Sequence, residues 1–122
     1  MWTNDDALKQ LAVRGFHGIP LTGSPGHSGM ILLTRAWDEP FRDQVVIRGA
    51  DEATACRVQI VDGVDVPRRK DCVWYSAGTV VEVADEITFH LPHPGNPHAP
   101  RSVIAVPDTL ALPPGVRADV HA

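Results

Sequence analysis

The chain has 122 residues, of which 43% are hydrophobic, and a formal net charge of −4 at pH 7. This length suits a single domain over residues 1–122, and the ordinary hydrophobic content predicts a folded chain rather than a disordered one. The acidic balance argues against a nucleic-acid partner, because such proteins usually present a basic patch.

No N-terminal stretch resembles a signal peptide, and no apolar run approaches the roughly 20 residues that span a bilayer. We therefore expect a cytoplasmic protein with no membrane partner. Its two cysteines, Cys56 and Cys72, are then expected to be reduced and buried. Cys72 follows a basic cluster at residues 68–70. Because nearby positive charge lowers the pKa of a thiol, Cys72 is the better candidate for a reactive cysteine.

The first predicted element is a helix over about residues 4–14. Thr3 or Asn4 can cap it, because a short side-chain oxygen accepts hydrogen bonds from the free amides of the first turn. Leu11 and its neighbours one turn away form an apolar face, and Gly15 suits the left-handed residue that ends a helix. A helix this short is not stable alone, so we expect it to dock on the rest of the chain.

The body of the fold is predicted over about residues 30–106. Residues 17–29 contain four glycines and two prolines, which predicts no regular element there. In the run 86–91, Ile87, Phe89 and Leu91 are expected to face the core, because successive strand residues point to opposite faces. Residues 107–122 are expected to form a tail. Strands are predicted at 30–37, 44–48, 54–61, 72–76, 79–83, 86–91 and 102–106.

These elements predict a mainly β fold class. We expect a small antiparallel sandwich or barrel of about seven short strands with one N-terminal α-helix. A parallel α/β fold is disfavoured, because parallel crossovers need helices and the pattern shows none after residue 15.

Three histidines, His90, His93 and His98, fall within nine residues. Neutral imidazole is the commonest biological metal ligand, and three imidazoles can form an open catalytic site. His90 is expected to end a strand and to point outward, while the other two lie in a proline-rich loop. The competing interpretation is a surface loop whose histidines bond to backbone or water. A small metal-binding protein or metalloenzyme, with a divalent metal such as zinc, is therefore the alternative function.

A serine-containing glycine motif and a ligand pocket are two further candidate sites. Residues 26–29 (GHSG) hold a serine between glycines, but Met30 stands where a nucleophile elbow needs its second glycine, so a glycine turn is preferred. A small-ligand pocket inside a barrel, with Glu82, Thr88 and His90 near its mouth, stays open as a third interpretation.

Three aromatic residues are the candidate binding residues. Trp74 and Tyr75 are neighbours on one predicted strand and must face opposite ways, so one is expected in the core and the other exposed or at an interface. Trp37 lies near the end of another strand. Tryptophan and tyrosine are favoured at binding hot spots, and sheet edges often pair between molecules. The leading prediction is therefore a non-catalytic β-rich binding or assembly module without a cofactor, acting through protein–protein contacts or self-association.

Overall fold

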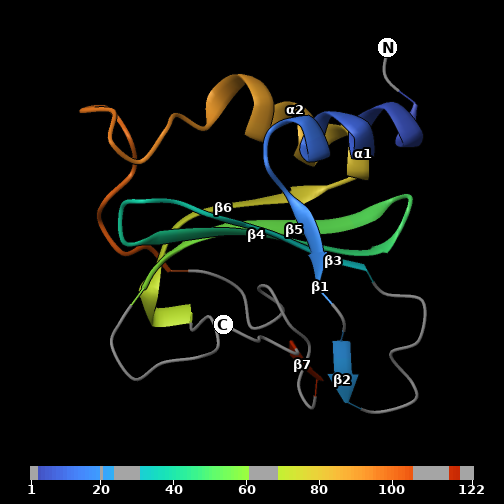
Figure 1. Cartoon of the computed structure of the whole chain (residues 1–122), viewed down its shortest axis with the longest axis horizontal. Helices are drawn as coiled ribbons and strands as arrows, with labels where there is room; N and C mark the ends of the chain where they lie inside the picture. Colours follow the sequence, from blue (N-terminus) through green and yellow to red (C-terminus); the bar gives the residue numbers. More distant parts are fainter. Residues whose placement is uncertain (1–2, 20, 24–30, 61–68, 106–115, 119–122) are drawn as a thin grey trace.

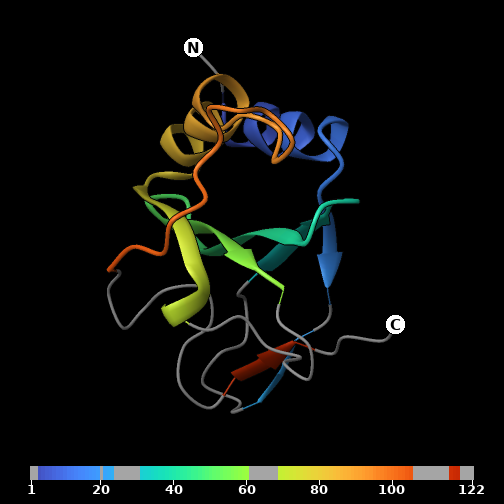
Figure 2. The ribbon, with the colours of Figure 1, turned by 90° about the vertical axis from the view of Figure 1, so that its left-hand side faces the viewer.

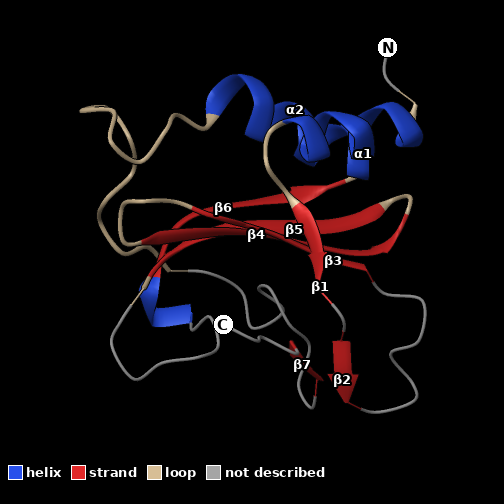
Figure 3. Ribbon diagram, viewed as in Figure 1, coloured by secondary structure: helices blue, strands red, loops and turns tan. Residues whose placement is uncertain are grey.

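The computed structural model describes residues 3–19, 21–23, 31–60, 69–105 and 116–118. Within these residues, five antiparallel strands form one sheet in the order β1-β3-β4-β5-β6, and two helices cover one of its faces (Figures 1 and 3). The elements of this layered body are α1 Asn4–Val13, β1 His17–Ile19, β3 Ile31–Ala36, β4 Phe41–Gly49, β5 Glu52–Gln59, β6 Cys72–Gly78 and α2 Val80–His90.

The mainly β, antiparallel prediction is confirmed, but the barrel is wrong. The sheet stays open, because β1 and β6 lie at its two opposite edges, as the end-on view shows (Figure 2). Over the described residues the main sheet has five strands rather than seven, and a sandwich of two sheets is not shown. A separate two-stranded pair joins β2, Leu21–Gly23, to β7, Val116–Ala118.

The largest error concerns residues 79–91, where two strands were predicted and the chain forms α2 instead. The helix begins at a capping box. The Thr79 side chain accepts from the Glu82 amide at 3.1 Å, and the Glu82 carboxylate accepts from the Thr79 amide at 3.0 Å. Pro92 follows the helix within two residues, where it cannot continue it.

The buried face of α2 has helical spacing. The residues buried within the helix are four, at i, i+3, i+4 and i+7, and they pack on α1 and on β5 and β6. Phe89, which a strand would have placed in the core, is 65% exposed. The four buried residues of α2 are Val80, Val83, Ala84 and Ile87.

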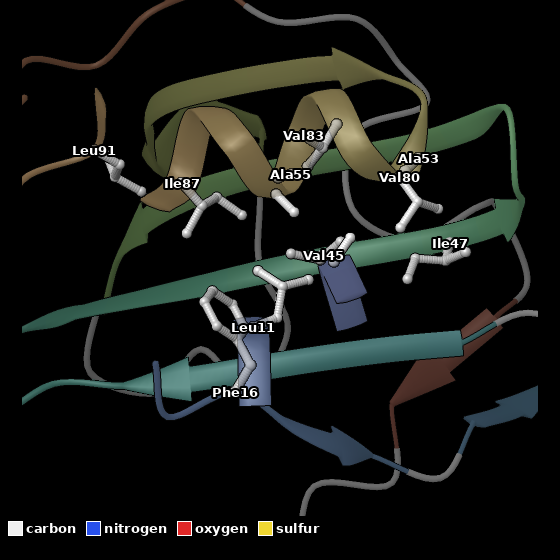
Figure 4. Packing of buried hydrophobic residues seen from close by; sticks show 12 residues of the cluster. Leu11, Phe16, Val45, Ile47, Ala53, Ala55, Val80, Val83, Ile87 and Leu91 are labelled. Atoms are coloured by element: carbon white, nitrogen blue, oxygen red, sulfur yellow. The ribbon is translucent and has the colours of Figure 1, made fainter. Parts of the chain in front are cut away.

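One hydrophobic core lies between the helices and the sheet (Figure 4). Leu11 and Phe16 enter it from the α1 side, while Val45 and Ile47 enter it from β4. Val46, which points to the opposite face, is also buried, so the centre of the sheet is shielded on both faces.

The predicted N-terminal helix is confirmed as α1. Thr3 is its cap and accepts from the Asp6 amide at 3.1 Å. At the other end, Gly15 has φ 98°, and the amide of Phe16 donates to the Leu11 carbonyl at 3.0 Å. This Schellman closure turns Phe16 into the core beside Leu11.

Three smaller predictions need correction. Residues 17–29 include two short strands, β1 and β2, whose backbone groups pair with β3 and β7. Residues 102–105 form no strand, although Ile104 donates one backbone hydrogen bond to Cys72 at 2.9 Å. The GHSG turn, residue 106 and most of the predicted tail lie outside the described residues, but 116–118 pairs as β7.

We expect the α2 cap to make stability depend on pH. Hydrogen bonds from the backbone and side chain of Thr79 lower the pKa of Glu82 from its usual 4.5. A carboxyl with a lowered folded pKa stabilises the fold above its unfolded pKa, and this contribution is lost as pH falls through the folded value. Thermal unfolding followed by circular dichroism, from neutral pH to about pH 3, should show this loss.

Glu82→Gln is the matched variant, because glutamine can make the same cap without titrating. Its melting temperature should fall less than that of the wild type over the acid range. Parallel pH profiles for the two proteins would contradict the assignment.

Candidate functional site

The predicted binding residues Trp74 and Tyr75 lie on β6, at one edge of the sheet. They face opposite ways, as predicted: Trp74 packs on the core under the helices, and Tyr75 packs on the other face beside Cys56 and Cys72. Neither side chain is fully buried or fully exposed, because both are half-buried at the edge of the sheet. An edge strand has a neighbouring strand on one flank, so side chains on either face are covered from one flank.

The outer flank of β6 lacks charged side chains and proline, which often protect the edge of a sheet. The strand reads CVWYSAG, with no charged residue and no proline. The Ile104 amide reaches Cys72 from outside the β5–β6 ladder. In the described part of the chain, β6 has no strand partner on the side away from β5.

Trp37 is not part of this surface. It follows β3, and two strands, β4 and β5, separate β3 from β6. Its indole Nε1 donates to Asp43 Oδ2 at 2.8 Å, and its ring lies 4.3 Å from the Arg35 guanidinium carbon. The structure therefore does not gather the three predicted aromatics, and assigns Trp37 to a different cluster.

This second cluster is a buried group of charges around Asp43. Arg57 is 0% exposed, Asp43 1% and Arg35 7%. Arg57 Nε donates to Asp43 Oδ1 at 2.6 Å and its Nη2 donates to Oδ2 at 3.0 Å, while Arg35 donates to Oδ2 from Nε at 3.2 Å and Nη2 at 2.7 Å. With the Trp37 indole, five donor atoms contact one carboxylate, four of them at Oδ2 and one at Oδ1, so its negative charge is committed to two guanidinium groups.

Two arginines and one aspartate leave one excess positive charge, which the helix ends offset. Arg35 Nη1 donates to the Arg14 carbonyl at the end of α1 at 3.0 Å. Arg57 Nη1 donates to the Pro92 carbonyl, just beyond α2, at 2.7 Å. Each helix C-terminus carries about half a negative charge, so the two together offset roughly one unit. Burial lowers the pKa of Arg35, and the hydrogen bond to Asp43 opposes that shift.

The sequence contained a signal for this cluster that was not used. Asp43 alternates with Val45 and Ile47, so it must face the same core. Arg57 stands in the same relation to Ala53 and Ala55 on β5. A charge in phase with core positions predicts a buried ion pair, because an isolated buried charge is too costly.

The loop that follows α2 contacts Trp37 through His93. His93 packs edge-to-face on the Trp37 ring with centroids 4.6 Å apart, and its Nε2 lies 3.8 Å from Glu39 Oε1. Its Nδ1 accepts from the Gly95 amide at 2.9 Å. The His93 ring therefore contacts the connection between β3 and β4, and its Nδ1 binds a backbone amide of its own loop.

His90, His93 and His98 do not form a ligand set. His90 is the last residue of α2 rather than the end of a strand, and both His90 and His98 are exposed. Among the described residues, no group of three or more histidines, cysteines or acidic residues could hold a metal ion. Zinc or other divalent metal binding stays a prediction, which elemental analysis of untagged protein can test. The pocket inside a barrel is wrong, since the sheet is open and Glu82 serves the α2 cap.

Comparison with known proteins identifies no relative. No family model matches the chain, and no curated protein or solved structure is similar to it. Over the described residues, neither helix has the length and apolar character needed to cross a membrane.

Proposed function

We propose that this protein is a non-catalytic binding and assembly module that pairs with a second copy of itself through β6. The observation that carries the proposal is the edge strand CVWYSAG, which has no charge or proline and, among the described residues, no strand partner on the side away from β5. Unpaired amides and carbonyls on such an edge are a template for another strand. The opposite edge strand, β1, has three residues against seven in β6 and offers a shorter template.

A second copy suits this edge because antiparallel pairing can be symmetric. Two β6 strands related by a two-fold axis present the same residues to each other, so one strand supplies both sides of the interface. The two five-stranded sheets would then form one continuous sheet.

Trp74 and Tyr75 support the proposal from the two faces of the strand. Each is half-buried by its own chain, and a paired copy would cover the remaining flank of both. Aromatic residues that become fully desolvated in this way contribute disproportionately to binding energy. The buried Asp43 cluster fits a structural role better than a catalytic one, because the carboxylate is 1% exposed and is bound by two arginines.

Ala77→Lys should abolish the assembly. Ala77 is an exposed residue of β6, so a lysine fits the single chain, but it puts a charge on the pairing edge, which opposes the addition of another strand. We expect light scattering coupled to size-exclusion chromatography to give a dimer mass for the wild type and a monomer mass for the variant.

Ala36→Lys is the matched control. Ala36 is an exposed alanine at the end of β3, so the variant carries the same added charge away from the β6 edge. It should remain dimeric. A wild type that is monomeric at all concentrations, or a dimer that both lysine variants retain, would contradict pairing through β6.

A further inference from the structure

The two cysteines of the chain are neighbours in space. Cys56 lies within β5 and Cys72 begins β6, and a register shift between Arg57 and Val58 places Cys72 opposite Val58. Both cysteines are free, fully buried and in one cluster with Val58, on the sheet face away from the helices. The Cys72 Sγ donates to the Trp74 carbonyl oxygen at 3.0 Å, and the Cys56 side chain packs in the same buried cluster.

The pKa values of the two thiols are shifted in opposite directions. Among the described residues, the hydrogen bond with Cys56 is the largest cause that lowers the pKa of Cys72, and the backbone of Trp74 acts in the same direction while burial opposes it. The same thiol pair and burial raise the pKa of Cys56 well above its usual value. The lowered pKa favours Cys72 over Cys56 as the nucleophile.

We propose that Cys56 and Cys72 are a redox-active dithiol that closes to an intramolecular disulfide when a peroxide oxidises it. Cys56 and Cys72 are diagonal neighbours on adjacent strands and pack in one buried cluster, so their sulfur atoms can approach to the bond length of about 2.05 Å. Both sulfur atoms belong to one chain, so the disulfide can form without the proposed pairing of β6.

The reaction balances with hydrogen peroxide as the oxidant. The Cys72 thiolate attacks one peroxide oxygen, the O–O bond breaks, and hydroxide leaves, which gives a Cys72 sulfenic acid. The Cys56 sulfur then attacks the Cys72 sulfur, the S–O bond breaks, and the released hydroxide takes the Cys56 proton to form water. In total, two thiols lose two electrons and two protons, and one peroxide becomes two waters.

Access to the pair runs through the start of β6. Cys72 is the first residue of an edge strand, and the Ile104 amide holds its carbonyl from outside the ladder. Edge-strand ends are among the segments that open locally without global unfolding. A small oxidant can therefore reach Cys72 in a brief opening, after which closure brings Cys56 alongside.

The test is to treat the folded, full-length protein with hydrogen peroxide and then count thiols in denaturant. The wild type should go from two thiols to none, with an intact mass lower by two hydrogen atoms and a peptide linking Cys56 to Cys72. Dithiothreitol should restore both thiols.

Cys56→Ala and Cys72→Ala are the controls, because each leaves one thiol and no partner. Peroxide should give neither variant an intramolecular link, and loss of the remaining thiol should be slower in Cys72→Ala. Should either variant fail to fold, the wild-type result alone decides. Two free thiols after treatment, disulfides between chains, or sulfinic acid in place of the link would overturn the proposal.

Discussion

Asp43→Asn should lower the free energy of unfolding by about 3–5 kcal/mol, the usual cost of removing one partner from a buried ion pair. Asparagine keeps the shape of the side chain but removes the charge that Arg35 and Arg57 share. Both guanidinium groups are then left buried with carbonyl oxygens and an amide as acceptors. Because a domain of this size is stable by about 5–15 kcal/mol, the variant is expected to be marginal. Urea unfolding followed by circular dichroism measures the change.

Two further variants separate a charge effect from a general intolerance of substitution. Arg57→Met removes one of the two cations and leaves a one-to-one pair between Arg35 and Asp43, so its loss of stability should be smaller than that of Asp43→Asn. Asp85→Ala, at an exposed position of α2, should change stability by about 0.5 kcal/mol or less. A loss below about 1 kcal/mol for Asp43→Asn, or a larger loss for Arg57→Met, would show that Asp43 does not neutralise the pair.

Asp85→Pro should destabilise the protein by about 3 kcal/mol or more, because proline inside a helix removes a backbone hydrogen bond and clashes with the preceding turn. Asp85 lies in the middle of α2, and its side chain is exposed, so the effect comes from the backbone alone. Denaturant unfolding and the loss of helical circular dichroism are the readouts.

This substitution also discriminates between the two interpretations of residues 79–91. In a hairpin that turns at residues 85–86, proline would sit in the turn and cost little. In α2 it breaks the helix that covers β5 and β6. Asp85→Ala is the control at the same position, and equal stability of the two variants would rule out the helix.

Much of the fold could be predicted because its signals are local. In α1, Thr3 caps the helix and Gly15 ends it, and both act through hydrogen bonds within a few residues. In β5, the alternation of Cys56, Arg57 and Val58 places each side chain on a definite face, whatever the partner strands are. These features need no knowledge of the rest of the chain.

Residues 79–91 show where local signals conflict. The spacing of Ile87, Phe89 and Leu91 favours a strand, while Thr79 and Glu82 form a capping box that favours a helix. Packing decides between them. As a helix, the segment buries four side chains against the sheet and α1. The same helix leaves the Phe89 side chain largely exposed, which is unfavourable for an apolar ring.

The candidate sites divide in the same way. The sequence by itself determined that Trp74 and Tyr75 face opposite ways and that the chain has two cysteines. Strand alternation also placed Asp43 and Arg57 on the same sheet face as core residues. Only the tertiary structure decided that β6 is an edge strand. It also decided that the Asp43 carboxylate binds both Arg35 and Arg57, and that Cys56 and Cys72 pack in one buried cluster. The physical reason is that side-chain direction is set by neighbouring backbone, whereas strand order and helix docking depend on burying the whole core at once.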